Sequence, residues 1–284
     1  MFKSIIGAAA LAALATVATL SACAAGPEAP VLHNLTGAAL QQTTARIDAL
    51  LPADVLLLGE QHDAAAHQQI HGQVIALLAQ RGLLGAVALE MADAGATTAA
   101  LHPSSTELQV QSALKWNNKG WPWQAYGPAV MAAVRAGVPV IGANLPRDAM
   151  RAVMGDAKLD NQLPGPALKA QQQLIRTGHC DLLPESQITP MTRIQIAKDI
   201  SIASNLSKAV LPGKVVVLLA GSAHVDKILG VPQHLASTVN AKAVRLRAGD
   251  AALGDSAQSF DAVWATPALP DKDYCAEFKA QMKQ

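Results

Sequence analysis

The sequence predicts an α/β fold with a mainly parallel sheet that is flanked by helices and carries a helical insertion. Short aliphatic runs alternate with helix-like stretches along the chain, and most of the runs end at glycine or a charged residue. Such runs are typical of strands that are buried on both faces of a parallel sheet. Their alternation with helices indicates that helices cover both faces. Hydrophobic residues make up 51% of the chain and charged residues 15%, which favours a large core.

Six strands are expected from the aliphatic runs. They lie at Val55–Leu58, Ala86–Leu89, Val138–Ile141, Val215–Leu219 and Ala243–Leu246, with a last one near Phe260–Ala265. Their lengths match those of buried strands and are too short for buried helices.

Three helices are expected between the strands. His67–Gln80 has apolar residues at helical spacing, and Ala125–Ala136 is followed by Gly137, a typical helix stop. Thr189-Pro190 has the form of a helix cap followed by proline in the first turn, and it predicts a helix to about Val210. The segments 97–126 and 155–189 break the alternation, so we expect a helical insertion over the sheet and no separate domain.

The first residues have the pattern of a lipoprotein signal. Lys3 precedes an apolar stretch from Ile5 to Leu20, and Leu20-Ser21-Ala22-Cys23 matches a cleavage site with cysteine directly after it. We expect residues 1–22 to be a signal peptide and Cys23 to be lipidated. An ordinary signal peptide or an uncleaved anchor remains an alternative. Residues 23–45 are then a tether and N-terminal segment, and residues 46–284 a single domain.

The remaining cysteines and the charge balance restrict the class of protein. If Cys23 carries lipid, Cys180 and Cys275 form an even pair, and an oxidising compartment would allow a disulfide between them. Two buried free thiols are the alternative. The net charge is +1 and there is no long basic run, so we expect no nucleic-acid partner.

Two patterns of the same form follow aliphatic runs. They are Gly59-Glu60-Gln61-His62 and Gly221-Ser222-Ala223-His224, and a third run ends at Glu90. Ligands of open α/β sheets bind at the carboxyl ends of the strands, so we expect His62, Glu90 and His224 to converge there. Together with Glu60 they form a set capable of metal binding or acid/base catalysis. Helix-start positions with a purely structural role are the alternative.

Aromatic residues are scarce but concentrated in one segment. Trp116, Trp121, Trp123 and Tyr126 lie within eleven residues. They favour a flat apolar ligand or, equally, packing of the insertion on the sheet. Tyr126 is a candidate haem-iron ligand because phenolate is a known axial ligand. Arg147 could hold a ligand carboxylate or form a structural ion pair.

Two further polar residues belong to the same edge of the sheet. Gln195 and Asp199 lie four residues apart on the third helix, so both could face the cleft. A solvated helix face is the alternative.

These motifs, in this order, resemble the ChaN family of haem-binding lipoproteins, within the wider EreA/ChaN and Tiki/TraB superfamily. The resemblance rests on the following segments: Gly59–Asp63, Leu89–Met91, Asn144–Arg147, Gly178–Cys180, Gln195 with Asp199, Ala220–His224 and Gly230–Pro232. It implies haem binding for iron uptake, a tyrosine iron ligand, and two haems stacked in a homodimer. Tyr126, Arg147 and Trp123 are the residues that we assign to the haem.

The resemblance also leaves an alternative function open. Enzymatic relatives use the two Gly-x-x-His patterns with glutamate as a metal-dependent or acid/base hydrolytic site. Here that role would fall to Glu60, His62, Glu90 and His224, with a divalent metal at His62, Glu90 and His224. Ala24 follows Cys23 where aspartate would retain a lipoprotein in the inner membrane. We therefore expect a lipid-anchored outer-membrane protein that faces the periplasm.

Overall fold

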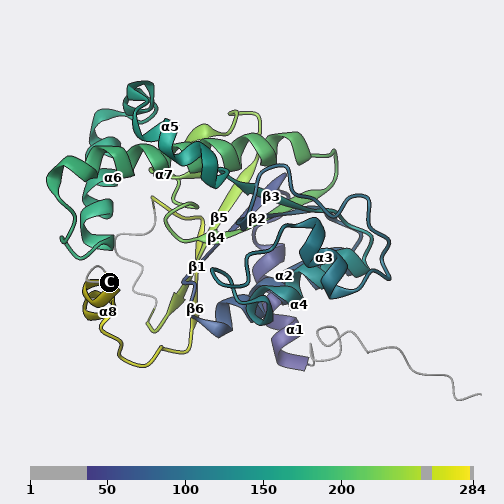
Figure 1. Cartoon of the computed structure of the whole chain (residues 1–284). Helices are drawn as coiled ribbons and strands as arrows, with labels where there is room; N and C mark the ends of the chain where they lie inside the picture. Colours follow the sequence, from purple (N-terminus) through teal and green to yellow (C-terminus); the bar gives the residue numbers. More distant parts are fainter. Residues whose placement is uncertain (1–36, 251–257, 282–284) are drawn as a thin grey trace, which may run out of the picture.

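One sheet of six parallel strands lies at the centre of the computed structural model, which describes residues 37–250 and 258–281 (Figure 1). The strand order is β3-β2-β4-β1-β5-β6. The strands are β1 (Val55–Glu60), β2 (Leu84–Asp93), β3 (Val140–Asn144), β4 (Val215–Gly221), β5 (Ala241–Ala248) and β6 (Ala262–Thr266).

Helices connect these strands and form the outer layers. The α-helices are α1 (Gly37–Asp48), α2 (Ala65–Gln80), α3 (Glu107–Ala113), α4 (Trp123–Arg135), α5 (Met150–Met154), α6 (Gly165–Gly178), α7 (Glu185–Ala209) and α8 (Tyr274–Gln281). Short 3₁₀ turns lie at η2 (Arg147–Ala149), η3 (Ala157–Asn161) and η4 (Val231–His234).

The two faces of the sheet pack against different helices because successive strand residues point to opposite sides. Leu56 and Leu58 of β1 belong to the core beneath α1, α2 and α4. Val55 and Leu57 belong to the core beneath α7. Figure 1 shows α7 with α5 and α6 on one side of the sheet and α1 to α4 on the other. The layers are those of a doubly covered α/β sheet.

Strand β4 lies between β1 and β2, and this position brings the two glycine–histidine motifs together. Glu60 of β1 pairs in register with Gly221 of β4. Beyond the strand ends, the amide of Ser222 donates to the carbonyl of Glu60 at 2.9 Å. The loops that carry the two motifs therefore leave the sheet side by side at its carboxyl edge.

The architecture confirms the fold class predicted from the sequence, with a sheet that is parallel throughout.

The expected start of the third helix was wrong. Helix α7 begins at Glu185, after Pro184, and Pro190 lies inside it. Residues 37–45, which belong to the expected tether and N-terminal segment, form most of α1, and Ile47 of this helix is completely buried. The predicted signal peptide and Cys23 lie outside the described residues.

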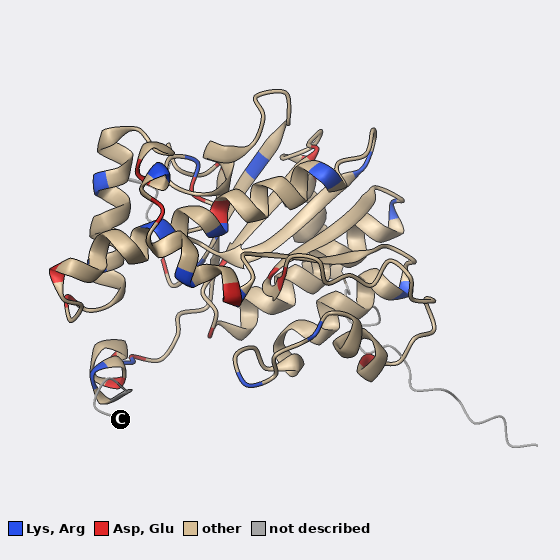
Figure 2. Cartoon of the chain, turned by 45° about the horizontal axis from the view of Figure 1, so that its top comes forward, with Lys and Arg blue, Asp and Glu red and all other residues tan. Residues whose placement is uncertain are grey.

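Charged residues are few and mixed in sign. Figure 2 shows Lys and Arg interspersed with Asp and Glu along the helices and loops, as the net charge of +1 leads one to expect. Within the described part of the chain, every helix is too short or too polar to cross a membrane.

Candidate functional site at the carboxyl edge of the sheet

Glu60 is the centre of a buried hydrogen-bond cluster on the α2/α4 side of the sheet. It ends β1 on the face that also carries Leu56 and Leu58, and it is 2% exposed. Its Oε1 accepts hydrogen bonds from His62 Nδ1 at 2.7 Å and from the Tyr126 hydroxyl at 2.6 Å. Its Oε2 accepts one from Gln68 Nε2 at 2.8 Å. The carboxylate is therefore fully engaged, as a buried charge must be.

Glu90 forms a second cluster, on the α7 side. Its Oε2 accepts the amide of Gly221 at 2.7 Å, and its Oε1 lies 3.2 Å from His224 Nε2. The other ring nitrogen of His224 lies 2.5 Å from Asp199 Oδ1 and 3.1 Å from Gln195 Nε2. With a carboxylate at each nitrogen, the ring of His224 is held as a donor on both sides.

His62 lies between the two clusters and reaches the surface. Its Nδ1 is bonded to Glu60, and its side chain is 42% exposed. A methyl group on Gly221 would lie 3.0 Å from His62 Nε2 and 3.6 Å from Glu90 Oε2, so glycine leaves the room that this ring occupies. Trp121 packs its ring edge-on against His62, with centroids 4.9 Å apart. His62, Glu90 and His224 thus meet at one edge of the sheet.

The charges of this cluster shift the pKa values of both histidines upward. Burial opposes a charge on His224, but Glu90 and Asp199 outweigh it and raise its pKa to about 10. Burial likewise opposes a charge on His62, but its hydrogen bond to Glu60 and the charge of Glu90 raise its pKa. Burial raises the pKa of Asp199 to about 6, although His224 acts in the opposite direction.

A neutral histidine completes the cluster around Glu60. His71 is completely buried, and its Nδ1 lies 3.5 Å from Glu60 Oε2. Neither of its ring nitrogens has a hydrogen-bond partner among the described residues. Burial lowers its pKa to about 4. His71 therefore stays uncharged at neutral pH, and the positive partner of Glu60 is His62.

The geometry does not support the expected divalent metal. Within residues 37–250 and 258–281, no group of three or more His, Cys, Asp or Glu side chains is arranged to hold an ion. The reason is that the candidate ligands bind one another. Both nitrogens of His224 contact carboxylates, and Nδ1 of His62 is bonded to Glu60.

Two residues assigned to haem lie in the interior. Tyr126 is 1% exposed and its hydroxyl donates to Glu60, while Trp123 is 5% exposed and donates from Nε1 to Glu107 at 2.7 Å. Burial and the negative charge of Glu60 raise the pKa of Tyr126 further from neutrality. The oxygen of Tyr126 could meet an iron atom only after leaving Glu60, so its assignment as the iron ligand stays a prediction. Both rings instead anchor α4.

A tyrosine of α8 lies beside the loop that carries His62. Tyr274 of α8 is 45% exposed, and its hydroxyl donates to Asp63 Oδ2 at 2.7 Å. Gln61 Nε2 lies 3.4 Å from the same oxygen. Because Gln61 and Asp63 flank His62, the exposed Tyr274 contacts the same loop that carries the exposed His62. Nothing in the local sequence of Tyr274 indicates this neighbourhood.

Arg147 borders a separate cavity at the same edge of the sheet. The exposed side chain follows β3 and lines a cavity of about 500 Å³ with Lys115, Asp93 and Asp148. It forms no ion pair within 4.0 Å in the described residues. It therefore remains free to bind a carboxylate.

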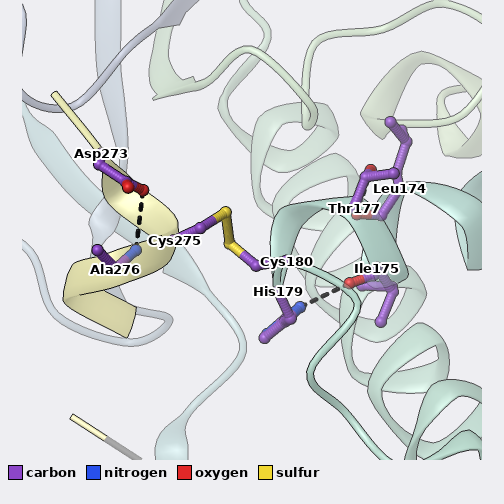
Figure 3. Close-up of a disulfide and its surroundings, with 8 residues drawn as sticks. All are labelled: Leu174, Ile175, Thr177, His179, Cys180, Asp273, Cys275 and Ala276. Carbon is purple, nitrogen blue, oxygen red and sulfur yellow. Dashed lines mark hydrogen bonds between the residues drawn. A yellow bond between two sulfur atoms is a disulfide. The ribbon is translucent and has the colours of Figure 1, made fainter. Parts of the chain in front are cut away.

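Cys180 and Cys275 are joined by a disulfide that attaches α8 to the end of α6 (Figure 3). Cys275 follows Tyr274 directly, so this bond holds the tyrosine close to the cleft.

Comparison with known proteins places this fold and site in a family. Residues 46–235 match the family described as haem-binding uptake, Tiki superfamily, ChaN. The chain belongs to this ChaN family. Among solved structures, ChaN of Campylobacter jejuni, described with cofacial haem binding, is 27% identical with a TM-score of 0.63. The match covers 78% of this chain and 90% of that one.

More distant similarities concern the backbone alone. The type III effector HopBA1 is 15% identical, with a TM-score of 0.45 over 80% of this chain and 94% of the effector. A Bacillus cereus protein is 14% identical, with a TM-score of 0.44 over 74% of this chain and 69% of its own. No curated protein matches the chain.

Proposed function

We propose that this chain binds haem at the carboxyl edge of its sheet and serves haem uptake at the bacterial envelope. The observation that carries the proposal is its membership of the ChaN family over residues 46–235. The similar ChaN of Campylobacter jejuni, described with cofacial haem, supports the same ligand for this chain.

Three exposed or half-buried groups at the carboxyl edge of the sheet fit a haem: Trp121, Tyr274 and Arg147. Trp121 is half-buried and offers a flat apolar surface next to His62. Tyr274 offers an exposed phenol oxygen, a donor that haem iron accepts. Arg147, which borders a neighbouring cavity at the same edge of the sheet, offers a guanidinium for a propionate, and it forms no ion pair with another described residue.

Tyr274 is the better of the two tyrosines as the iron ligand. Its oxygen is accessible, whereas that of Tyr126 would have to leave the buried carboxylate of Glu60. A phenol must lose its proton to bind ferric iron; in Tyr274 this proton lies in an exposed 2.7 Å hydrogen bond to Asp63, which raises the pKa of the phenol, so iron must displace both the proton and this contact. Bound haem would supply the redox-active iron, while Tyr274, Trp121 and Arg147 hold the ring in place.

Hemin titration of the purified protein, with matched tyrosine variants, tests this assignment. We expect saturable binding of one haem per protomer and a tyrosinate signal in resonance Raman spectra. Tyr274→Phe should remove the signal and weaken binding, and Tyr126→Phe should keep it. Loss of the signal only in Tyr126→Phe would reassign the ligand, and a histidine-type spectrum would assign it to His62. Absence of saturable binding in the unmutated protein would refute haem binding.

We also propose that two protomers enclose stacked haems, as the family resemblance implies. Flat rings that remain exposed on each protomer would be buried against each other by dimerisation, which favours association. Sedimentation velocity with and without one equivalent of hemin should show a monomer that becomes a dimer on loading. A monomer in both states would refute the stacked arrangement.

A hydrolase is the second candidate, because Asp199, His224 and Glu90 form a buried acid–base array beside the exposed ring of His62. A histidine whose Nδ1 is held by a carboxylate can exchange a proton with a substrate through Nε2. Hydrolysis by proton exchange through His62 needs no metal. Hydrolysis of ester and amide substrates that is lost in His62→Gln and unaffected by chelators would support it.

A further inference from the structure

Among residues 37–250 and 258–281, few interactions other than its disulfide hold helix α8 on the protein. From Tyr274 to Ala280 its side chains are exposed, and only Phe278 is half-buried, against the ring of His179 at a centroid distance of 5.6 Å. Figure 3 shows the helix approaching the end of α6 through the Cys180–Cys275 bond, with the Asp273 carboxylate capping its first turn. An eight-residue helix without an apolar face has little tendency to stay docked by itself.

The same helix supplies the cleft with its exposed tyrosine. The hydroxyl of Tyr274 meets Asp63 and Gln61, which flank His62, and the next residue is the disulfide-bonded Cys275. The two polar contacts of this hydroxyl are exposed, so they stabilise the docked position only weakly. The covalent bond therefore decides whether Tyr274 remains at the cleft.

Neither cysteine of the disulfide is buried in the core. Cys275 is exposed and Cys180 is half-buried. A thiolate can therefore attack the bond, whereas a disulfide enclosed in a core would be protected.

We propose that the Cys180–Cys275 bond is a thiol-sensitive latch that keeps Tyr274 in the haem site and releases it on reduction. A dithiol reductant transfers two electrons and two protons to the bond, which yields two cysteine thiols and leaves the reductant as a disulfide. Helix α8 then separates from α6, and Tyr274 leaves Asp63. The inference rests on the proposed haem function, and it adds control of that site by the thiol state.

A set of variants of the full chain, titrated with hemin under oxidising conditions, tests the latch. Because tethering sets the effective concentration of the tyrosine, Cys180→Ser/Cys275→Ser should weaken hemin binding about tenfold or more. Tyr274→Phe should cause a similar loss, and the triple variant should lose no more than either, since both changes remove one interaction. Glu277→Gln, which breaks the exposed Lys272–Glu277 pair on α8, should bind like the unmutated protein.

Amide hydrogen exchange of α8 without haem separates the latch from the haem proposal. The latch predicts rapid exchange over residues 274–281 in the serine variant and slower exchange in the disulfide-bonded protein, with the sheet equally protected in both. Equal hemin affinity of the two proteins would overturn the latch and leave haem binding intact. Failure of the unmutated protein to bind hemin would refute the haem proposal and the gating of that site, while exchange would still show whether the disulfide holds α8.

Discussion

His224 is a buried cation between Glu90 and Asp199, so its removal takes away the positive charge that the two buried carboxyl groups share. We expect His224→Gln to lower the free energy of unfolding by about 3–5 kcal/mol at pH 6, the cost of breaking a buried ion pair. Urea denaturation measures this loss. His102→Gln, a change at an exposed histidine before α3, should alter stability by less than about 0.5 kcal/mol.

The loss in His224→Gln should depend on pH. Since the pKa of His224 is raised in the folded state to about 10, its stabilising effect is complete below the unfolded value near 6.5. It is lost as the pH rises through about 10. The difference between the two proteins should therefore shrink from pH 6.5 upward, and a constant difference would show that His224 is not a cation.

His71 shows the opposite dependence because burial depresses its pKa to about 4. Between pH 6.5 and about 4, this imidazole is protonated in the unfolded chain but neutral in the folded chain. The free energy of unfolding therefore falls as the pH is lowered. His71→Leu should remove this dependence and be more stable than the unmutated protein by about 2–3 kcal/mol at pH 4.5. His102→Leu serves as the control and should keep the original slope in urea titrations at each pH.

Sequence reasoning identified the residues at the strand ends, but it assigned the haem to Tyr126 and Trp123, whose side chains the structure buries. Glu60, His62, Glu90 and His224 meet because carboxyl ends of parallel strands share an edge, which is a general property of the fold. Whether a tyrosine is buried depends on packing between elements. The sequence therefore gave no reason to prefer Tyr274, which is brought to the cleft by a bond between distant cysteines.

At the scale of elements, the contact between the end of β1 and the loop after β4 requires Gly59. An added Cβ would lie 2.3 Å from Val225 Cγ2 and 3.0 Å from the backbone of Ser222. We expect Gly59→Ala to lower the free energy of unfolding by about 1–3 kcal/mol, the cost of overpacking. Gly178→Ala, where nothing lies within 4 Å, should be neutral or slightly stabilising in the same denaturation experiment. Equal stability of the two variants would contradict this close approach.

The strands were predictable and several helices were not, for physical reasons. Aliphatic runs such as Val215–Leu219 have only one stable environment, the interior of a sheet. Helix α6 was hidden by the prolines around it, and Pro190, which has the sequence pattern of a helix start, lies inside α7 beyond its first turn. The sequence of helix α8 shows no apolar periodicity, and from Tyr274 to Ala280 its side chains are exposed except for the half-buried Phe278.

At the scale of the whole molecule, the N-terminal segment predicts where the protein is attached. We expect Cys23 to carry lipid after removal of residues 1–22, because Leu20-Ser21-Ala22-Cys23 follows an apolar stretch. Cys23→Ser should abolish labelling by a fatty-acid probe and move the protein from the membrane to the soluble fraction. Cys180→Ser, which replaces a cysteine of the disulfide, should leave the labelling unchanged. Continued labelling of Cys23→Ser would rule out this lipid site.

The insertion of β4 between β1 and β2 has a consequence for synthesis of the chain on the ribosome. Both β1 and β2 are complete by Asp93, yet the strand that joins them begins at Val215. Until that strand emerges, each of them presents an edge of unpaired backbone groups, a surface that invites aggregation. From the synthesis of Asp93 until Val215–Gly221 emerges, the nascent chain is therefore exposed to premature pairing, and the two glycine–histidine motifs first meet when this late strand enters the sheet.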